Sequence, residues 1–238
     1  MNISLIFAGG VGARMNTRTR PKQFLELNGK PIIIYTLEVF EKHPEIDAIV
    51  VVCVEEWIPY LKKLLTKHEI TKVEAIVGGG ETGQDSIYNG LVAISEKFDL
   101  GSTVLIHDGV RPLINEETIS DNIRLVAETG SCITCIPTIE TFIVKDESGL
   151  LNIPERKDSL IARAPQSFRL EDILSSHNKA RAEGRHDFID SCSMMNHYGY
   201  KLSTTIGPME NIKITTPTDF FIFRAMEEVR ENSQIFGY

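Results

Sequence analysis

Short apolar runs rich in β-branched residues alternate, over residues 3–137, with longer segments in which apolar side chains recur at helical intervals. Runs of this length predict buried strands, and their alternation with helices is typical of βαβ units. The helical segments can cover both faces of a sheet, so the pattern predicts a doubly wound α/β architecture. The predicted strands are 3–8, 48–54, 73–77, 103–107 and 132–137, and the predicted helices are 32–40, 57–66, 86–97 and 116–128.

The pattern changes after Pro137. The sequence ETFIVKDESGLLNIPERKDSLIARAPQSF mixes short strand-like runs with Gly149 and Pro154, and it lacks the period of a packed helix. We interpret residues 138–166 as an arm that projects from the core. No linker or internal repeat divides the 238 residues, so we expect a single domain. Beyond the arm, the predicted elements are a helix over 170–181, a strand over 201–206 and a helix over 216–231.

The composition is that of an ordinary folded protein, with 42% hydrophobic and 24% charged residues. A formal net charge of −8 argues against a nucleic-acid partner, because such partners favour a broad basic surface. No apolar run approaches the length that crosses a membrane and no signal-peptide pattern is present, so we expect a cytoplasmic protein without a membrane partner. The four cysteines are scattered, and disulfides are not expected. Cys132 and Cys135 have redox spacing but are interpreted as core thiols.

Ligands of doubly wound sheets bind at the carboxyl ends of the strands, so we expect the functional residues in the segments that follow the predicted strands. After the first strand, AGGVGARM combines small residues, which let backbone N–H groups approach an anion, with cations that can reach back to phosphates. Arg14, Arg18, Arg20 and Lys22 place four cations within nine residues. This indicates an anion site, with a Gly-rich turn on a solvated surface as the alternative. The segment is neither a Walker loop nor a dinucleotide fingerprint.

Three further segments fall at strand ends. GGGETGQDS follows the third strand, and its glycines let backbone pack against a base or ribose, although they could form a plain turn. HDGVRP follows the fourth strand and carries Asp108 and Arg111. A carboxylate there, next to a triphosphate, is a natural Mg²⁺ ligand, with a turn cap as the alternative. NIKITTP carries Lys213, which could also be a surface lysine. Their joint occurrence at the ends of one sheet predicts nucleotide chemistry.

In this order, AGGVGARM, PKQFLEL, GGGETGQDS, HDGVRP, APQSF and NIKITTP resemble the CTP-dependent polyol-phosphate cytidylyltransferases, which act on 2-C-methyl-D-erythritol 4-phosphate or D-ribitol 5-phosphate. The resemblance runs from residue 3 to about residue 230. It implies a Rossmann-like nucleotidyltransferase fold related to GT-A glycosyltransferases, with a mainly parallel sheet. It also implies Mg²⁺ as cofactor and a homodimer formed through the arm. The implied reaction is in-line attack by a polyol phosphate on the α-phosphorus of CTP, with release of pyrophosphate.

The resemblance also implies roles for single residues. The phosphates of CTP would be held by three catalytic cations, Arg14, Lys22 and Lys213. The nucleotide would be surrounded by Ala8, Gly9, Gly10, Gly12, Gly80 and Ser86, with Glu81 near the ribose. Thr141 and Arg156 match residues on the arm that reaches the partner's acceptor site. Asp108, Arg111 and Asp190 are further candidates for binding the acceptor, the last two named from their positions in the sequence alone. The metal would be held by Asp108, with Glu210 as a second candidate.

Several positions depart from the methylerythritol branch, and they bear on the acceptor. Ala164 stands where a threonine is expected, Glu210 replaces an aspartate, and the usual arginine after the GG turn is absent around Gly83. HDGVRP and Trp57 look more like the ribitol branch. We therefore expect D-ribitol 5-phosphate as acceptor, giving CDP-ribitol, with methylerythritol 4-phosphate as the alternative. A sugar-1-phosphate nucleotidyltransferase and a non-catalytic nucleotide-binding domain are more distant alternatives.

Two other polar residues have competing interpretations. His107 adjoins Asp108 but is interpreted as a packed histidine, since a phosphate nucleophile with a second pKa of about 6 needs no strong base. Asp190 could approach the hydroxyl groups of the acceptor, or it could cap the helix that follows it.

Overall fold

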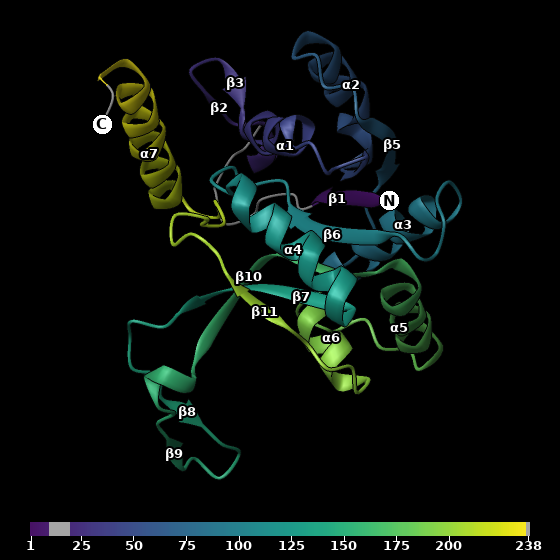
Figure 1. Ribbon diagram of the computed structural model, residues 1–238, viewed down its shortest axis with the longest axis vertical. Coiled ribbons are helices and arrows are strands. Elements are labelled where there is room, and N and C mark those ends of the chain that lie inside the picture. Colours follow the sequence, from purple (N-terminus) through teal and green to yellow (C-terminus); the bar gives the residue numbers. More distant parts are fainter. Residues whose placement is uncertain (10–19, 237–238) are drawn as a thin grey trace.

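The computed structural model describes residues 1–9 and 20–236, with side chains as far as residue 232. Its centre is a seven-stranded sheet in the order β11-β7-β10-β6-β1-β4-β5 (Figure 1). All neighbouring strands are parallel except β10, which runs antiparallel to both β6 and β7. The predicted α/β fold with a mainly parallel sheet is confirmed. The sheet strands are β1 (Asn2–Ala8), β4 (Ala48–Cys53), β5 (Val73–Gly78), β6 (Thr103–Asp108), β7 (Ser131–Pro137), β10 (Leu160–Arg169) and β11 (Thr204–Ile206).

Helices cover the sheet on both faces because successive strand side chains point to opposite sides. Ile6 of β1 packs in the cluster formed with α1, α2 and α4, whereas its neighbour Leu5 packs with α3, α5 and α6. Each helix predicted from the periodicity is present. The helices are α1 (Ile32–Lys42), α2 (Ile58–Lys67), α3 (Gly83–Ser95), α4 (Glu116–Thr129), α5 (Leu170–Ala182), α6 (Ser191–His197) and α7 (Pro217–Phe236).

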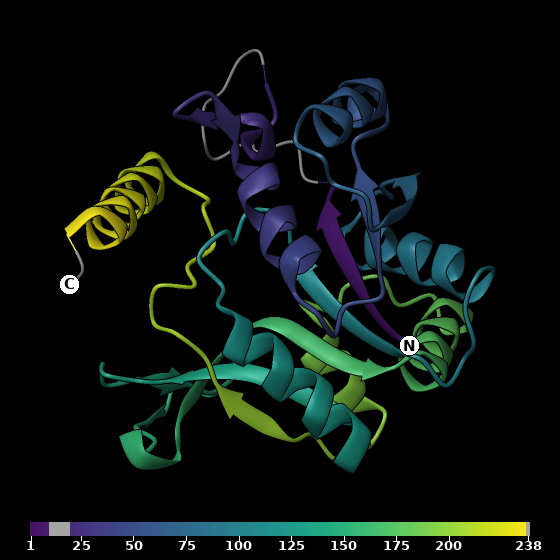
Figure 2. The same ribbon diagram turned by 45° about the horizontal axis from the view of Figure 1, so that its top comes forward.

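A third apolar cluster joins α7 to the rest of the molecule. Phe223 of α7 packs with Leu27 of the β2 (Glu26–Leu27) and β3 (Lys30–Pro31) hairpin and with Ile214 in the loop before α7. Beyond these contacts α7 (yellow) leans away from the sheet (Figure 2). Among the described residues no helix is long and apolar enough to cross a bilayer.

Part of the segment assigned to the arm belongs to the sheet. Residues 160–166 lie in β10, which pairs with β7 and β6. Pro165 and a register irregularity between Ala162 and Gln166 interrupt the strand, which explains why its alternation was not apparent. The arm proper is therefore residues 138–159, with β8 (Val144–Lys145), β9 (Leu151–Asn152) and the 3₁₀ turn η4 (Arg156–Asp158).

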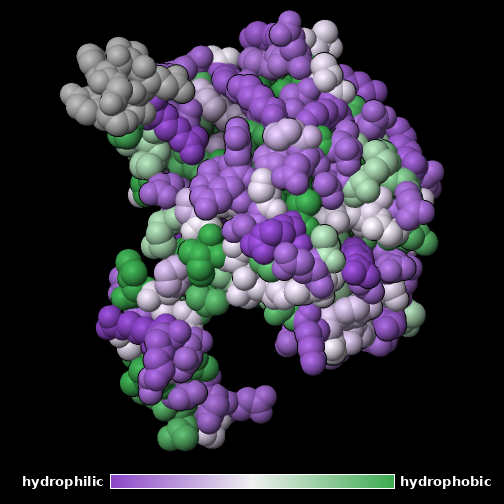
Figure 3. Space-filling view, in the orientation of Figure 1, coloured by the Kyte–Doolittle hydropathy of each residue, from purple (hydrophilic) through white to green (hydrophobic). Residues whose placement is uncertain are grey.

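The arm projects from the sheet as a separate lobe (Figure 1). Hydrophobic side chains gather on it, and a hollow separates it from the body of the molecule (Figure 3). Its exposed large apolar residues are Ile139, Phe142, Ile143, Val144, Leu150, Leu151 and Ile153.

Candidate active site

The carboxyl ends of β1 and β6 bring three charged side chains together. Asp108 is the last residue of β6 and pairs with Phe7 of β1. Arg111 donates from Nε to Asp108 Oδ2 at 2.7 Å, and Lys213 Nζ lies 2.5 Å from Asp108 Oδ1. These three residues form the charge cluster. Because a parallel sheet presents its strand ends on one edge, the cluster lies where ligands of such folds bind.

Burial and ion pairing act in opposite directions on the Asp108 carboxyl. Its side chain is 7% exposed, and desolvation alone would raise its pKa. The charges of Arg111 and Lys213 outweigh that effect and hold the pKa of Asp108 well below its ordinary value. The carboxylate is therefore ionised at neutral pH, and the cluster carries a net positive charge. Lys213 is 40% exposed, so its ammonium can also reach a bound anion.

The loop before α7 is fastened to the turn after β6, and this places Lys213 in the cluster. Arg111 Nη1 donates to the carbonyl of Asn211 at 2.9 Å, and Ile214 N donates to the carbonyl of Val110 at 2.9 Å. Asn211 is buried and donates from Nδ2 to the Ala164 carbonyl at 2.7 Å. Lys213 is thus held from both sides by backbone contacts and is not a simple surface lysine.

A cavity of about 300 Å³ opens beside the charge cluster. All three cluster residues line it, together with residues of β10 and of α3, α5 and α6. Ile106 and Asp108 of β6 share one face of their strand, and Ile106 packs in the apolar cluster of α3, α5 and α6. The cavity therefore lies on that face of the sheet, with a charged side and a largely apolar side.

One wall of the cavity is the segment between α5 and α6. Gln84 donates from Nε2 to the Arg185 carbonyl at 2.8 Å and accepts from Phe188 N at 3.1 Å. Asp85 accepts from Arg181 at 2.9 Å and contacts His186 at 3.0 Å. The start of α3 therefore fixes this wall in place.

A second recess lies where β1 ends against the start of α3. Ser86 Oγ accepts from Gly80 N at 3.0 Å and donates to the Thr82 carbonyl at 2.9 Å. A Cβ atom on Gly9 would lie 3.0 Å from Ser86 Oγ, and one on Gly80 would collide with Asp85. Glycine is required at Gly80, because a Cβ atom there would overlap the backbone of Asp85, and a Cβ atom on Gly9 would require Ser86 to shift.

The comparison with known proteins assigns the chain to a family. Residues 3–228 match the family described as IspD, 2-C-methyl-D-erythritol 4-phosphate cytidylyltransferase. The chain belongs to this family. Its members are nucleotidyltransferases, and the Rossmann-like α/β fold found here is theirs.

The individual relatives within the IspD family differ in their named acceptor. The chain is 57% identical over 238 residues to a ribitol-5-phosphate cytidylyltransferase of Vibrio parahaemolyticus serotype O3:K6, covering 100% of both chains. It is 38% identical over 222 residues to a 2-C-methyl-D-erythritol 4-phosphate cytidylyltransferase of Clostridium botulinum strain 657, covering 93% of this chain and 95% of the other. A solved 4-diphosphocytidyl-2C-methyl-D-erythritol synthase of Anaerococcus prevotii superposes with a TM-score of 0.81 at 26% identity, over 95% of this chain and 96% of the other.

On this IspD scaffold, several of the expected nucleotide-binding residues lie together. Gly9, which follows Ala8 at the end of β1, lies against Ser86, and Ser86 in turn accepts a hydrogen bond from Gly80 N. The exposed Glu81 follows Gly80. Gly10, Gly12 and Arg14 lie outside the described residues. Lys22 begins the 3₁₀ turn η2 (Lys22–Phe24).

The turn that carries Lys22 is anchored at its two following residues. Gln23 is buried and donates from Nε2 to the carbonyl of Ala8 at 2.6 Å. Phe24 stacks on Trp57 with ring centroids 4.9 Å apart. Trp57 therefore supports the turn through which the chain returns to the end of β1.

The expected acceptor residues separate into two groups. Asp108, Arg111 and Asp190 line the cavity, whereas Thr141 and Arg156 lie on the arm. Arg156 Nη2 donates to Thr141 Oγ1 at 2.9 Å, so the two residues form a pair, but neither lines the cavity of its own chain.

Asp190 caps α6, which was one of its two expected roles. Its Oδ1 accepts from Ser193 N at 2.8 Å in a capping box, and its Oδ2 accepts from Gln166 at 3.0 Å. It also lines the cavity, so the other expected role stays a prediction.

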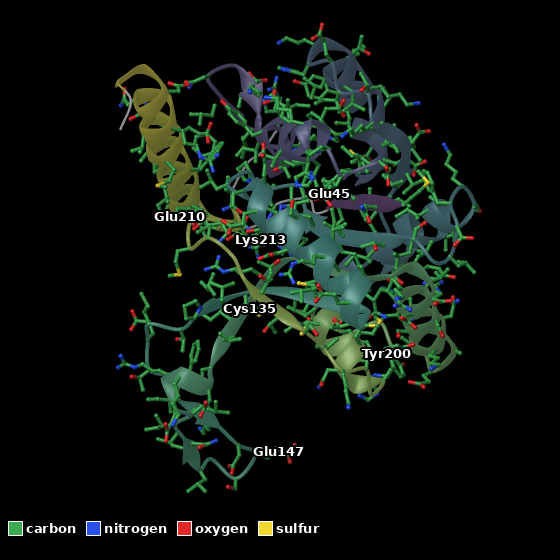
Figure 4. The ribbon with its side chains drawn as sticks, in the orientation of Figure 1. Glu45, Cys135, Glu147, Tyr200, Glu210 and Lys213 are labelled. Atoms are coloured by element: carbon green, nitrogen blue, oxygen red, sulfur yellow. The ribbon has the colours of Figure 1, made fainter. Side chains whose placement is uncertain are left out.

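Glu210 and His107 lie beside the charge cluster without joining it. Glu210 is exposed on the loop that carries Lys213 and leads into α7 (Figure 4). His107 is fully buried, contacts the Arg111 carbonyl through Nε2 at 3.1 Å, and lies against the ring of Phe40. Burial lowers the pKa of His107 to about 4, so it is a neutral, packed histidine, as predicted from its sequence.

Sequence reasoning missed two cavity residues with unused hydrogen-bonding groups. Arg163 of β10 has a buried Nε without a hydrogen-bond partner among the described residues, and burial followed by the charge of Arg111 lowers its pKa. His177 of α5 is buried beside the cavity. The signal for His177 was its position on the apolar face of α5, at helical spacing from Ile173 and Ala180. Arg163 had no such signal, because β10 was not predicted.

Proposed function

We propose that this chain transfers CMP from CTP to D-ribitol 5-phosphate, forming CDP-ribitol and pyrophosphate. The charge cluster at the ends of β1 and β6, beside a recess that requires glycine, is the observation that supports phosphate chemistry. The acceptor is supported by the 57% identity over the whole chain to a protein named for ribitol 5-phosphate. Methylerythritol 4-phosphate is the second candidate, because relatives at 38% identity carry that name.

In this proposal the nucleotide binds across the end of β1. Ala8, Gly9, Gly80 and Ser86 surround the base, and Gly10 and Gly12 also bind the nucleotide. Glu81 lies by the ribose, and Arg14 and Lys22 hold the triphosphate. Lys213 is the cation nearest the α-phosphate. Its ammonium exchanges part of its contact with Asp108 for the phosphoryl oxygens when CTP is bound.

The acceptor phosphate attacks the α-phosphorus in line. A new bond forms between a phosphate oxygen of ribitol 5-phosphate and the α-phosphorus, and the bond from that phosphorus to the bridging oxygen breaks, so pyrophosphate leaves with the electron pair. The nucleophile is largely dianionic at neutral pH, since its second pKa is about 6. The barrier is the approach of two anions, and Arg111 and Lys213 lower it by electrostatic stabilisation and positioning.

A divalent cation fits this site if its ligands come both from the protein and from the triphosphate. The described residues contain no group of three or more His, Cys, Asp or Glu side chains that could enclose a metal by themselves. Mg²⁺ is usually held by one or two carboxylates plus substrate phosphates, and the ionised Asp108 supplies one such ligand, with Glu210 as the second candidate. When bound, Mg²⁺ would neutralise phosphate charge and orient the leaving group.

We also propose that the protein is a homodimer in which each arm reaches the acceptor site of its partner. The exposed apolar residues of the arm form a surface suited to burial against a second chain. The Thr141 and Arg156 pair would then contribute to the partner's cavity. We expect the enzyme to act in the cytoplasm on these two small molecules, without nucleic acid or membrane, and its four cysteines are free, in keeping with that reducing compartment.

The test is pyrophosphate release with each of the four NTPs, measured against ribitol 5-phosphate, methylerythritol 4-phosphate and a set of sugar 1-phosphates. We expect turnover with CTP and ribitol 5-phosphate well above every other pair. Turnover with a sugar 1-phosphate would overturn the assignment, and silence with every pair would favour a non-catalytic nucleotide-binding domain.

A further inference from the structure

A buried histidine on the apolar side of the cavity has no hydrogen bond. His177 is 1% exposed and lines the cavity from α5. Neither Nδ1 nor Nε2 has a hydrogen-bond partner anywhere in the part of the chain that the structure describes. Its ring neighbour is Tyr88, with centroids 6.0 Å apart. Buried polar groups are normally paired, so an unpaired imidazole at a cavity wall calls for an explanation.

Two other polar side chains of the cavity wall, Gln84 and Gln166, already make hydrogen bonds. Gln84 uses its amide to hold Arg185 and Phe188. Gln166 donates to Asp190 and accepts from Cys192 N at 2.8 Å. Gln84 and Gln166 therefore already use their amide groups in hydrogen bonds, whereas both ring nitrogens of His177 are without a partner among the described residues.

The imidazole is neutral, and this determines what it can bind. Burial lowers the pKa of His177 to about 4, with opposing smaller effects from Asp85 and Arg181. A neutral imidazole has one N–H donor and one acceptor nitrogen. A hydroxyl group can form a hydrogen bond with either nitrogen, whereas a methyl group can form none. Because the ring is uncharged, it does not attract an ion.

We propose that His177 binds a hydroxyl group of the acceptor and makes the site selective for a polyol phosphate that carries a hydroxyl, not a methyl group, at that position. This inference rests on the proposed function. The charge cluster on the same cavity takes the phosphate end of the acceptor, which leaves the polyol chain to lie along the remaining lining. A site built to hydrogen-bond a substrate hydroxyl discriminates strongly against analogues that lack it, because its own polar group then stays buried and unpaired.

The first experiment compares His177→Leu with His177→Gln in steady-state kinetics. Leucine fills similar space without a hydrogen bond, and glutamine keeps one donor and one acceptor. For His177→Leu we expect kcat/KM with ribitol 5-phosphate to fall about tenfold or more, while KM for CTP is unchanged. His177→Gln should recover part of the loss. The selectivity between ribitol 5-phosphate and methylerythritol 4-phosphate should shrink in the leucine variant.

A matched control is His68→Leu. His68 follows α2, its Nε2 is also buried without a partner, and it does not line the cavity. A generic effect of removing a histidine nitrogen that is buried and unpaired would appear in both variants, whereas acceptor binding predicts a change only at His177. The proposal would be overturned if kcat/KM for ribitol 5-phosphate were the same in His177→Leu and the wild type. It would also be overturned if kcat/KM for CTP and kcat/KM for the acceptor fell by the same factor.

A binding measurement on the wild-type protein does not depend on the variants folding. Titration of ribitol 5-phosphate into the CTP-bound protein should shift the ring ¹⁵N signals of His177, assigned by their loss in His177→Gln. Ribitol 5-phosphate lacking one hydroxyl at a time should reproduce the shift except for one analogue. Turnover of ribitol 5-phosphate without any shift of His177 overturns this inference and leaves the proposed function standing. Absence of both turnover and binding overturns the two together.

Discussion

Asp108 is a buried carboxylate that binds two cations, one from the turn after its own strand and one from the loop before α7. Burying the charges of Asp108 and Arg111 is costly unless each has its partners, because the desolvation penalty must be offset by ion pairing and hydrogen bonds. Arg111 meets that condition through Asp108 and the carbonyl of Asn211. The cluster is thus stable without ligand and already positively charged at the point where phosphates are to bind.

Replacing Asp108 with asparagine should destabilise the protein in a pH-dependent way. At pH 7 we expect the free energy of unfolding to fall by about 3 kcal/mol, since Arg111 then keeps a buried charge without its carboxylate. The pKa of Asp108 is lowered in the folded protein, so its contribution is complete above the unfolded value of about 3.9 and declines as the pH falls below it.

Urea denaturation of both proteins between pH 7 and pH 3 measures this difference. The gap between wild type and Asp108→Asn should be largest near neutrality and should narrow below about pH 4. A gap that stays constant down to pH 3 would show that the charge of Asp108 does not stabilise the fold.

Lys213→Ala should affect the reaction more than the fold. Its side chain is 40% exposed, so little apolar packing is lost, but the α-phosphate loses its cation. We expect kcat to fall by a factor on the order of 10² to 10³. Pyrophosphate release measures the rate, and thermal unfolding should give nearly the wild-type Tm.

The control for Lys213→Ala is Lys97→Ala. Lys97 makes an exposed ion pair with Glu74, and such pairs contribute little to stability. Both the rate and the Tm of this variant should match the wild type. A rate loss of similar size in the two variants would remove the special role of Lys213.

At the scale of elements, the start of α3 organises both recesses of the site. Thr82 caps the helix by accepting from Asp85 N at 3.0 Å. The same turn presents Ser86 to Gly80 and Gly9, and Gln84 to the wall of the cavity. One helix terminus therefore sets the geometry of the nucleotide side and of the acceptor side.

Gly80→Ala tests this arrangement, because a Cβ atom there meets the backbone of Asp85, which cannot move without disturbing α3. We expect a loss of about 1–3 kcal/mol in the free energy of unfolding and a higher KM for CTP. Denaturant unfolding and initial-rate kinetics measure the two effects.

Gly83→Ala is the paired control for stability. A Cβ atom on Gly83 meets nothing within 4 Å, although the residue lies only three positions further along. Its free energy of unfolding should be unchanged or slightly higher, since alanine reduces the entropy of the unfolded chain. If Gly80→Ala is as stable as Gly83→Ala, the close approach at Gly80 is not a constraint.

At the scale of the whole molecule, the arm is the part whose exposed surface is best explained by contact with a second chain. It carries exposed apolar side chains and an ordered Thr141–Arg156 pair on a lobe that is separated from the body (Figure 3). A second chain would bury those side chains and bring the pair to a cavity. The dimer proposal therefore predicts that the arm of one chain completes the acceptor site of the other chain.

Mixing two inactive variants tests that prediction. Arg156→Ala has an intact cavity and a defective arm, and Lys213→Ala has the reverse. If the arm acts on the partner, unfolding and refolding the two together should restore about a quarter of wild-type activity, because about half of the randomly paired dimers contain one complete site.

The control is each variant refolded alone, which should stay inactive. If the arm acts within its own chain, the mixture also stays inactive. Light scattering on the same samples measures the mass, and a monomer would contradict the dimer proposal directly.

The sequence by itself determined the elements and the places where chemistry lies. Apolar periodicity is a local property, so the parallel strands and their helices could be predicted from windows of a few residues. The predicted strands also define where strands end, and the sequence places Gly80, Asp108 and Lys213 in segments that follow strands, which makes them candidate site residues. The roles of these residues, and of Arg14, Gly10 and Gly12 outside the described part of the chain, stay predictions.

Only the tertiary structure decided how those places are joined. Which strand pairs with which depends on contacts between distant segments, and no local period encodes them. β10 enters antiparallel between β6 and β7, despite Pro165 and its irregular register, and so carries Arg163 to the cavity. The sequence spacing of His177 is that of a core residue, and only the tertiary structure shows that it borders a cavity. The charge cluster likewise exists only because the loop before α7 is fastened to the turn after β6.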